Sequence, residues 1–390
     1  MGAMRVPSKT PLLLACLAAL ACAALAPLAA ARARWSAQAA NDWYAQQPWL
    51  VGANYIPANA INQLEMWQAD TFDPERIDRE LGWAESIGMN TMRVFLHDLL
   101  WQQDSQGFKQ RIDTFLTIAD RHHIRPLLVL FDSCWDPAPH LGKQHEPVPG
   151  IHNSGWVQSP GATELTDPAQ YPKLEAYVKG IVGAFANDKR ILAWDVWNEP
   201  TVEPPTDSHW LAQEAPHKDE LVRKLLPHVF EWARAAEPTQ PLTSGVYASG
   251  GWSSWEKWPR TAQIQIEESD ILSFHSYGRP EELTRRVESL LPYGRPILCT
   301  EYMARSVGST FENTLPILRK YDVGAINWGL VAGKTQTIYP WDSWDQPYTG
   351  EHRLAVWFHD VFQADGRPYR QKEVDLIRQL SGRTRDRSSH

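Results

Sequence analysis

The chain has 390 residues, of which 43% are hydrophobic and 22% charged, a composition that excludes a disordered protein and supplies enough apolar material for a large core. Its formal net charge of −8 disfavours nucleic acid as a partner, because phosphates require a basic surface. A neutral ligand fits better, and the 19 tryptophans suit either stacking on sugar rings or packing in the core.

The N-terminus has the pattern of an export signal. Met1, Arg5 and Lys9 precede an apolar stretch over residues 11–26, and small residues follow at 29–31. This stretch is short for a membrane span, so we expect cleavage after about Ala31, no membrane span in the mature chain, and a secreted or periplasmic protein. An uncleaved anchor and a lipid on Cys16 are the alternatives.

We expect three segments: a signal peptide over residues 1–31, one folded domain over 32–382, and a polar, disordered tail over 383–390. Without the signal only Cys134 and Cys299 remain, and two cysteines do not make a disulfide framework. We therefore expect free or buried thiols. Separately, we expect a monomer.

Short apolar runs alternate with amphipathic stretches from residue 50 onward, which is typical of repeated βα units. Asp73 and Pro74 indicate a helix start, and Gly88 a stop. Further helices are predicted over 108–121, 171–185, 220–236, 281–291 and 311–321. Strands are predicted over 51–55, 91–97, 126–132, 191–197, 242–247, 271–277, 297–301 and 325–328. Eight strands with intervening helices favour an α/β fold with a single closed (β/α)₈ barrel over an open doubly wound sheet.

The barrel prediction places functional residues at the carboxyl ends of the strands. No glycine-rich phosphate loop follows the first strand, which disfavours a nucleotide site. The segment over residues 133–167, after the third strand, is too long for a plain connection. We expect it to wall a cleft at the active end of the barrel, with Trp135, His152, Asn153 and Trp156 contributing.

Two carboxyls end predicted strands. Glu199 follows the fourth strand in Asn198-Glu199-Pro200, where Pro200 should restrict Glu199 to an extended backbone, and Glu301 ends the seventh strand. Each signal alone is weak, because Asn-Glu-Pro is common and a glutamate after a strand is usually solvated. Together the two carboxyls form the pair that glycosidic bond cleavage requires.

Further residues fall at strand ends in a recognisable order: Arg93 ends the second strand, Asn198-Glu199-Pro200 the fourth, His275 and Tyr277 the sixth, Glu301 the seventh and Trp328 the eighth. In this order the sequence resembles glycoside hydrolase clan A, most nearly the cellulase- and mannanase-type family 5. The resemblance covers essentially the whole mature chain. It implies retaining hydrolysis of β-linked oligo- or polysaccharides that are gluco-, manno- or xylo-configured.

The resemblance also assigns roles. Glu301 would be the nucleophile and Glu199 the acid and then the base, with carboxyls about 5 to 5.5 Å apart. Arg93 and Tyr277 would donate hydrogen bonds to Glu301, Asn198 would hold the sugar 2-hydroxyl, and Trp328 would floor the sugar site. A structural ion pair for Arg93, a rim position for His275 and core packing for Trp328 are the alternatives. His97, Asp132 and Trp135 are weaker candidates for a wall of the sugar site, with structural roles as the alternative.

Other functions remain open. A carbohydrate-binding protein that has lost catalysis, and a transglycosylase that uses the same two carboxyls, fit the same residues. No cofactor or metal is implied, because His122 and His123 have no carboxylate or cysteine at ligand spacing and suit a helix cap or the surface. The segment over 133–167 and the tryptophan-rich segment over 331–348 could together close one end of the cleft, which favours short substrates or exo action.

Overall fold

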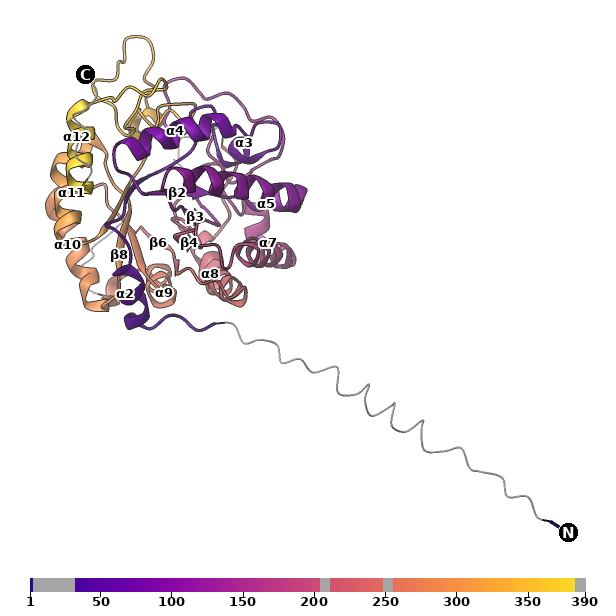
Figure 1. Ribbon diagram of the computed structural model, residues 1–390. Helices are drawn as coiled ribbons and strands as arrows, with labels where there is room; N and C mark the ends of the chain where they lie inside the picture. Colours follow the sequence, from indigo (N-terminus) through magenta and orange to yellow (C-terminus); the bar gives the residue numbers. More distant parts are fainter. Residues whose placement is uncertain (3–31, 204–210, 248–254, 383–390) are drawn as a thin grey trace.

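A computed structural model describes residues 1–2, 32–203, 211–247 and 255–382. Its centre is a nearly closed sheet of nine strands in the order β5-β4-β3-β2-β1-β9-β8-β7-β6, in which every recorded pair is parallel (Figure 1). The strands are β1 Val51–Asn54, β2 Thr91–Phe95, β3 Leu127–Val129, β4 Ala193–Asp195, β5 Leu242–Thr243, β6 Gly245–Val246, β7 Leu272–His275, β8 Ile297–Glu301 and β9 Gly324–Asn327. Because only Ser244 separates β5 from β6, the two count as one interrupted strand, and the predicted (β/α)₈ barrel is confirmed.

Helices surround the barrel in the predicted alternation (Figure 1). The helix predicted from Pro74 begins there, and the Asp73 carboxylate accepts from the backbone N–H of Arg76. The six predicted helices correspond to α4 Pro74–Ser86, α5 Asp98–Arg121, α7 Tyr171–Ala184, α8 Lys218–Ala235, α10 Pro280–Leu290 and α11 Phe311–Lys320. Sequence periodicity did not indicate α2 Ala37–Tyr44, α3 Gln63–Trp67, α6 Ala162–Thr166, α9 Arg260–Glu268 or α12 Gln371–Ser381.

The barrel strands are buried along their whole length, so they carry apolar runs and not an alternating pattern. At the amino-terminal end of the barrel, Leu50, Leu192 and Ile326 belong to a buried cluster on which Trp35, Trp43 and Tyr44 pack. The last two residues lie on α2, which therefore covers this end (Figure 1). The opposite end, where the strands finish, carries the long loops.

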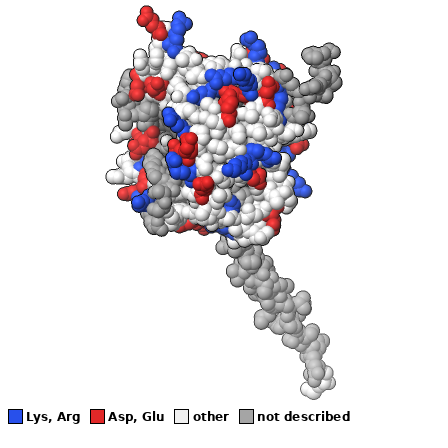
Figure 2. All heavy atoms as spheres, turned by 90° about the vertical axis from the view of Figure 1, so that its left-hand side faces the viewer, with Lys and Arg blue, Asp and Glu red and all other residues white. Residues whose placement is uncertain are grey.

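The face that carries α10, α11 and α12 shows Lys and Arg interspersed with Asp and Glu (Figure 2). This face therefore offers no continuous basic surface for a phosphate backbone. None of the helices in the described ranges is both long and apolar enough to cross a bilayer. Residues 3–31 of the signal predicted over 1–31, and the tail predicted over 383–390, lie outside the described residues.

Candidate active site

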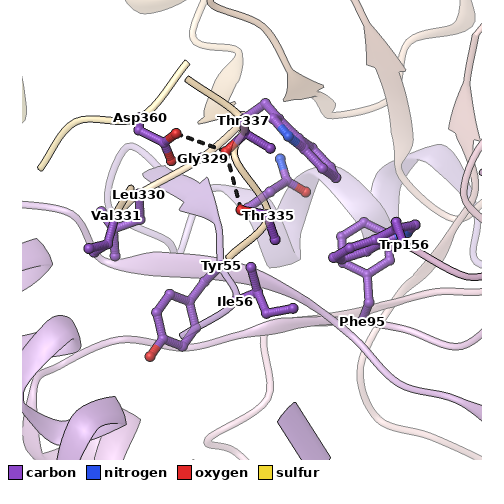
Figure 3. A pocket seen from close by; sticks show the side chains of 12 residues that line it. Tyr55, Ile56, Phe95, Trp156, Gly329, Leu330, Val331, Thr335, Thr337 and Asp360 are labelled. Carbon is purple, nitrogen blue, oxygen red and sulfur yellow. Dashed lines mark hydrogen bonds between the residues drawn. The ribbon is translucent and has the colours of Figure 1, made fainter. Parts of the chain in front are cut away.

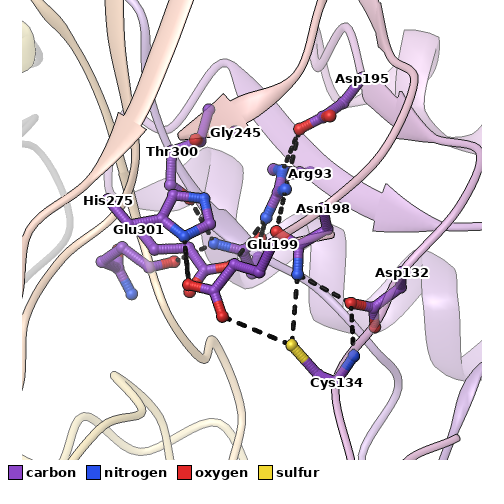
Figure 4. A network of polar contacts seen from close by, with 12 residues as sticks. Arg93, Asp132, Cys134, Asp195, Asn198, Glu199, Gly245, His275, Thr300 and Glu301 are labelled. Atoms are coloured by element: carbon purple, nitrogen blue, oxygen red, sulfur yellow. Dashed lines mark hydrogen bonds and ion pairs between the residues drawn. The ribbon is translucent and has the colours of Figure 1, made fainter. Parts of the chain in front are cut away.

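The predicted site residues gather around a cavity of about 200 Å³ at the carboxyl ends of the strands. Glu301 is the last residue of β8 and His275 the last of β7, whereas Glu199 lies four residues beyond the end of β4 (Figure 4). The cavity is lined by Cys134, Trp135, His152, Asn153, Asn198, Glu199, Val202, Tyr247, Tyr277, Glu301, Trp328, Trp341 and His359. The loop after β3 thus walls the cleft through Trp135, His152 and Asn153 as expected, whereas Trp156 lines a separate cavity.

The two glutamates lie close together. One carboxylate oxygen of Glu199, one of Glu301 and one ring nitrogen of His275 all lie within 4.8 Å of one another. A pair used for retention is separated by about 5 to 5.5 Å, and a pair that must admit water between them by about 6.5 to 9.5 Å. The observed proximity favours the retaining geometry.

Glu301 is held by two strong donors. Arg93 Nη1 donates to Oε1 at 2.9 Å, and Tyr277 Oη donates to Oε2 at 2.7 Å. Burial raises the pKa of Glu301 to about 7, an effect opposed by His275, by the Arg93 charge and by the Tyr277 hydrogen bond. Burial also raises the pKa of Tyr277 well above its usual value, so its hydroxyl stays a donor.

Glu199 has weaker partners. Its Oε1 lies 2.6 Å from Nδ1 of His275, and its Oε2 accepts a weak hydrogen bond from the Cys134 thiol at 3.5 Å. Burial raises the pKa of Glu199 to about 7, and the negative charge of Asp132 adds to that shift. Burial lowers the pKa of His275 to about 4, so the imidazole is neutral and does not stabilise an ionised Glu199 by charge.

The extended backbone expected for Glu199 is wrong, because its φ is 39°. The preceding residue is fixed by two backbone hydrogen bonds, from Asn198 N to Phe131 O at 2.8 Å and from Ser133 N to Asn198 O at 3.3 Å. The chain must turn sharply after this anchor, and Glu199 takes a strained conformation of the kind found at functional sites.

Arg93 is completely buried in the middle of β2 and links four partners. Besides Glu301, its guanidinium donates to Asp195 at 2.8 Å, to Asn54 at 2.9 Å and to the Asn198 side-chain oxygen at 2.5 Å (Figure 4). The predicted contact with Glu301 and the alternative structural ion pair are therefore both present.

Asn198 lines the cavity, and its amide faces the protein. Its Nδ2 donates to Asp132 Oδ1 at 2.8 Å and faces Cys134 Sγ at 3.6 Å. Asp132 also accepts from Trp156 Nε1 at 2.5 Å and does not line the cavity. The prediction of Asp132 as a wall of the sugar site is wrong, because its carboxylate lies behind the wall and orients Asn198 and Trp156.

His97 is also wrong as a wall residue. It is fully buried at the N-cap of α5, where its Nδ1 accepts from the Leu99 backbone N–H at 3.2 Å. It is absent from the cavity lining. A ring nitrogen here satisfies a helix N-terminus, so the structural alternative holds.

Trp135 and Trp328 both line the cavity. Trp135 stacks on Trp344 with ring centroids 5.0 Å apart. Trp328 also lines a second cavity, of about 20 Å³, which Figure 3 shows. The second cavity is bounded by Phe95, Trp156 and Asp360 among others, and has room for about one water molecule, not a sugar.

Sequence reasoning missed Cys134, Val202, Tyr247 and His359 as cavity residues. Tyr247 ends the predicted fifth strand and Cys134 follows the third, so the strand-end rule could have found both. His359 lies 32 residues beyond β9 without a local pattern, as its number and the strand boundary show. Only the tertiary fold returns it to the site.

The two remaining predictions concern metals and thiols. His122 is the C-cap of α5, as expected of a capping role, and its ring lies between Asp78 at 2.9 Å and Glu85 at 3.0 Å. Cys134 and Cys299 are free thiols. Glu199, His275 and Glu301 are close enough to share an ion, but the Arg93 guanidinium already neutralises Glu301, which disfavours a cation at that carboxylate.

No protein-family model matches the chain. Mannan endo-1,4-beta-mannosidase A of Emericella nidulans is 23% identical over 205 residues, which are 50% of this chain and 48% of that protein. The chain thus spans about half the length of the curated relative it matches.

Solved structures with a similar fold carry glycoside hydrolase names. GH5_18 of Streptomyces cattleya, solved with Manβ1-4GlcNAc, matches with a TM-score of 0.58 and 13% identity over 88% of this chain and 82% of that one. An exo-β-1,4-mannosidase of Opitutaceae bacterium matches with a TM-score of 0.53 and 18% identity, over 85% of this chain and 59% of that one. An endo-β-1,4-mannanase of Thermotoga petrophila matches with a TM-score of 0.52 and 12% identity, over 85% of this chain and 76% of that one. These matches confirm, at the level of the fold, the resemblance to glycoside hydrolase family 5.

Proposed function

We propose that this chain is a retaining glycoside hydrolase that cleaves β-mannosides, with Glu301 as the nucleophile and Glu199 as the acid and base. The observation that carries this proposal is the pair of carboxyls, Glu301 buried and Glu199 mostly buried, whose oxygens lie within 4.8 Å at the carboxyl end of a (β/α)₈ barrel. The mannose configuration is supported by the names of the structural neighbours and of the curated relative.

The hydrogen bonds divide the two roles. Arg93 and Tyr277 both donate to Glu301, so its carboxylate is the one held ionised and aimed for attack. Glu199 has a neutral imidazole and a thiol beside it, so the proton that the pair shares resides there. Burial raises the pKa of both carboxyls to about 7, as a general acid needs near neutral pH, so the hydrogen bonds and not the pKa values assign the acid.

The reaction then follows double displacement. Glu301 forms a bond to the anomeric carbon while the glycosidic C–O bond breaks, and Glu199 gives its proton to the leaving oxygen. In the second half Glu199 takes a proton from water, whose oxygen displaces Glu301 from the sugar. Both half-reactions invert the anomeric carbon, so the product retains the configuration of the substrate.

We further propose exo action on short chains. The loop after β3 and the segment over residues 331–348 join into one wall: Asn153 N donates to Thr335 O at 2.7 Å, and His152 N donates to Ser343 Oγ at 2.9 Å. A cavity of about 200 Å³ behind such a wall accommodates little more than one sugar ring. Mannose as the first product from mannohexaose would support this, whereas dimers and trimers from the outset would contradict it.

The test of the main proposal uses aryl β-mannosides with two leaving groups. Glu301→Gln should lower kcat/KM by at least about 1,000-fold on every substrate. Glu199→Ala should do so with a poor leaving group, yet release 2,4-dinitrophenol in a fast first turnover, because that phenolate leaves without a proton. Full activity in both variants would refute the assignment.

The same panel separates the alternatives. Binding of mannobiose without turnover by the wild-type chain would favour the carbohydrate-binding protein. Products longer than the substrate would favour transglycosylation, which directs the Glu301 intermediate to a sugar acceptor.

We also propose that the chain is exported. The charged, apolar and small-residue order of residues 1–31 supports this. Amino-terminal sequencing of the protein recovered from an expressing bacterium should begin near residue 32, and an intact Met1 in a cytoplasmic fraction would contradict export.

A further inference from the structure

One part of the cavity wall carries buried polar atoms without a partner in the protein. The Asn153 side chain is 1% exposed, and neither its Oδ1 nor its Nδ2 has a hydrogen bond. His359 is fully buried, and its Nε2 has none. Both residues line the catalytic cavity. A buried polar group without a partner destabilises the folded state, so folding alone does not account for these atoms.

The protonation of His359 follows from its other nitrogen. Nδ1 lies 2.5 Å from the carbonyl oxygen of Met303, which only accepts, so Nδ1 carries the hydrogen. Burial lowers the pKa of His359 well below its usual value, and the ring is neutral. Its Nε2 is therefore a bare acceptor on a residue that lines the cavity, and it suits a hydroxyl donor.

The Asn153 amide is available because the backbone alone fixes this residue. Its N–H donates to Thr335 O at 2.7 Å, and its carbonyl accepts from Trp156 N at 3.2 Å. Its φ of 52° is a conformation that asparagine tolerates better than most residues. The side chain makes no hydrogen bond that would explain an asparagine here, and it can both donate and accept.

These atoms lie beside the nucleophile. The His359 ring contacts the Tyr277 ring at 5.5 Å between centroids, and Tyr277 donates to Glu301. On its other side His359 contacts His152 at 5.5 Å, and His152 precedes Asn153 in the chain. The unpartnered groups thus lie on the part of the wall that a sugar ring bound at Glu301 would face.

We propose that Asn153 and His359 bind hydroxyl groups of the sugar ring held at Glu301 and so set the specificity for a neutral, hydroxylated ring. This inference rests on the proposed function and names the part of the site that recognises the sugar. Among the described residues that line the cavity there is no Lys or Arg. The wall therefore has no partner for a carboxylate, and glycosides of uronic acids should not be substrates.

The test pairs two variants that keep the local fold. Asn153→Gly removes the amide and suits the positive φ. His359→Asn keeps a donor near the Met303 carbonyl and removes the Nε2 acceptor. Each should lower kcat/KM on an aryl β-mannoside by about 10- to 100-fold, because a bound hydroxyl loses its partner. Thr314→Val, a buried change on α11 away from the cavity lining, is the matched control and should leave kcat/KM unchanged.

Monodeoxy mannosides identify the contact. Removing a sugar hydroxyl should lower kcat/KM for the wild type. The same removal should lower kcat/KM no further for the variant that lacks the side chain bound to that hydroxyl, because the same interaction is already lost. Melting temperatures should not fall in Asn153→Gly, since its amide has no partner to lose in the free protein. Unchanged kcat/KM in both variants, or additive losses with every deoxy substrate, would overturn the inference.

A binding measurement keeps the inference separate from the proposed reaction. Mannobiose is titrated calorimetrically into Glu301→Gln, with and without Asn153→Gly. A Kd raised by about 10-fold or more supports the contact even where the wild type shows no turnover. An unchanged Kd overturns it even where the wild type is a fully active hydrolase.

Discussion

The two glutamates proposed as catalytic differ mainly in their neighbours, since the side chains of both are largely buried. Arg93 and Tyr277 supply Glu301 with a charged and a neutral donor, whereas a thiol and a neutral imidazole face Glu199. A site with two similar carboxyls can therefore keep one ionised and the other protonated. The asymmetry originates in single side chains from β2 and from the loop after β7.

The pH dependence of activity should report the proton on Glu199. With its pKa raised to about 7 by burial, kcat/KM should fall about tenfold per pH unit above that value. In the variant Cys134→Ala, ionised Glu199 loses the hydrogen bond from the thiol, which raises the pKa of Glu199. The alkaline limb of the kcat/KM profile should therefore move to higher pH. A limb that stays in place in Cys134→Ala would show that the thiol does not act on Glu199.

Glu199 should also link stability to pH. Its folded pKa lies above the usual value of 4.5, so the folded state holds the proton more tightly than the unfolded state does. Stability is then lost as pH rises from about 4.5 to about 7. Glu199→Gln should remove this loss and raise the free energy of unfolding at about pH 8 by on the order of 1 to 3 kcal/mol relative to wild type. Urea unfolding at about pH 5 and pH 8 checks it, and the same offset at both values would contradict it.

At the scale of elements, the loops at the barrel mouth are fixed to one another by a buried amine. Lys218, the first residue of α8, is 3% exposed and donates to Ser133 O at 3.0 Å, Val202 O at 2.6 Å and Glu214 Oε2 at 2.6 Å. One side chain thereby connects the loop after β3 with the loop after β4, and Val202 lines the cavity.

Lys218→Met should destabilise the protein by about 3 to 5 kcal/mol, because it leaves the partly buried Glu214 carboxylate without its cation and two carbonyl groups without this donor. The same change at Lys179, which forms an exposed ion pair with Glu175, should cost less than about 1 kcal/mol. Urea unfolding of both variants measures the difference. Equal small effects at the two positions would show that the loops do not depend on Lys218.

At the scale of the whole molecule, helix α12 fixes the segment that carries His359. Arg305, in the loop after β8, donates to the Glu373 carboxylate of α12 at 2.6 Å and to the carbonyl oxygen of His359 at 2.6 Å. The Arg305 Nη2 that contacts Glu373 also donates to the carbonyl oxygen of Asp360 at 2.8 Å. The C-terminal helix is thereby coupled to the cavity wall through one buried ion pair.

Arg305→Met should cost about 3 to 5 kcal/mol of stability and lower kcat/KM on the aryl β-mannoside, because Glu373 loses its buried partner and the His359 carbonyl loses its donor. Arg370 also lies near Glu373, at 3.5 Å, but its side chain is half-exposed. Arg370→Met is therefore the control and should have little effect on stability or on kcat/KM. A drop in stability without any drop in kcat/KM would show that the Arg305–Glu373 ion pair does not support the cavity wall.

The sequence by itself determined the barrel and the two carboxyls, because both are written in local patterns. Buried parallel strands appear as short apolar runs, amphipathic helices as a 3.6-residue period, and functional residues of a barrel as the polar residues that end strands. Glu199, Glu301 and Tyr277 could be named on this basis. Short elements such as α3 and α6 escaped because one turn of helix has too few residues for a period to show.

Only the tertiary structure decided how the site is built around those carboxyls. Asp132 and His97 follow or end strands as wall residues would, yet their side chains turn away to serve Asn198 and the start of α5. The positive φ of Glu199 arises from hydrogen bonds to another loop, against the preference set by Pro200. His359 reaches the cavity through a coil held by Arg305, and such long-range contacts leave no periodic trace in a sequence, because they depend on pairs of residues far apart in the chain.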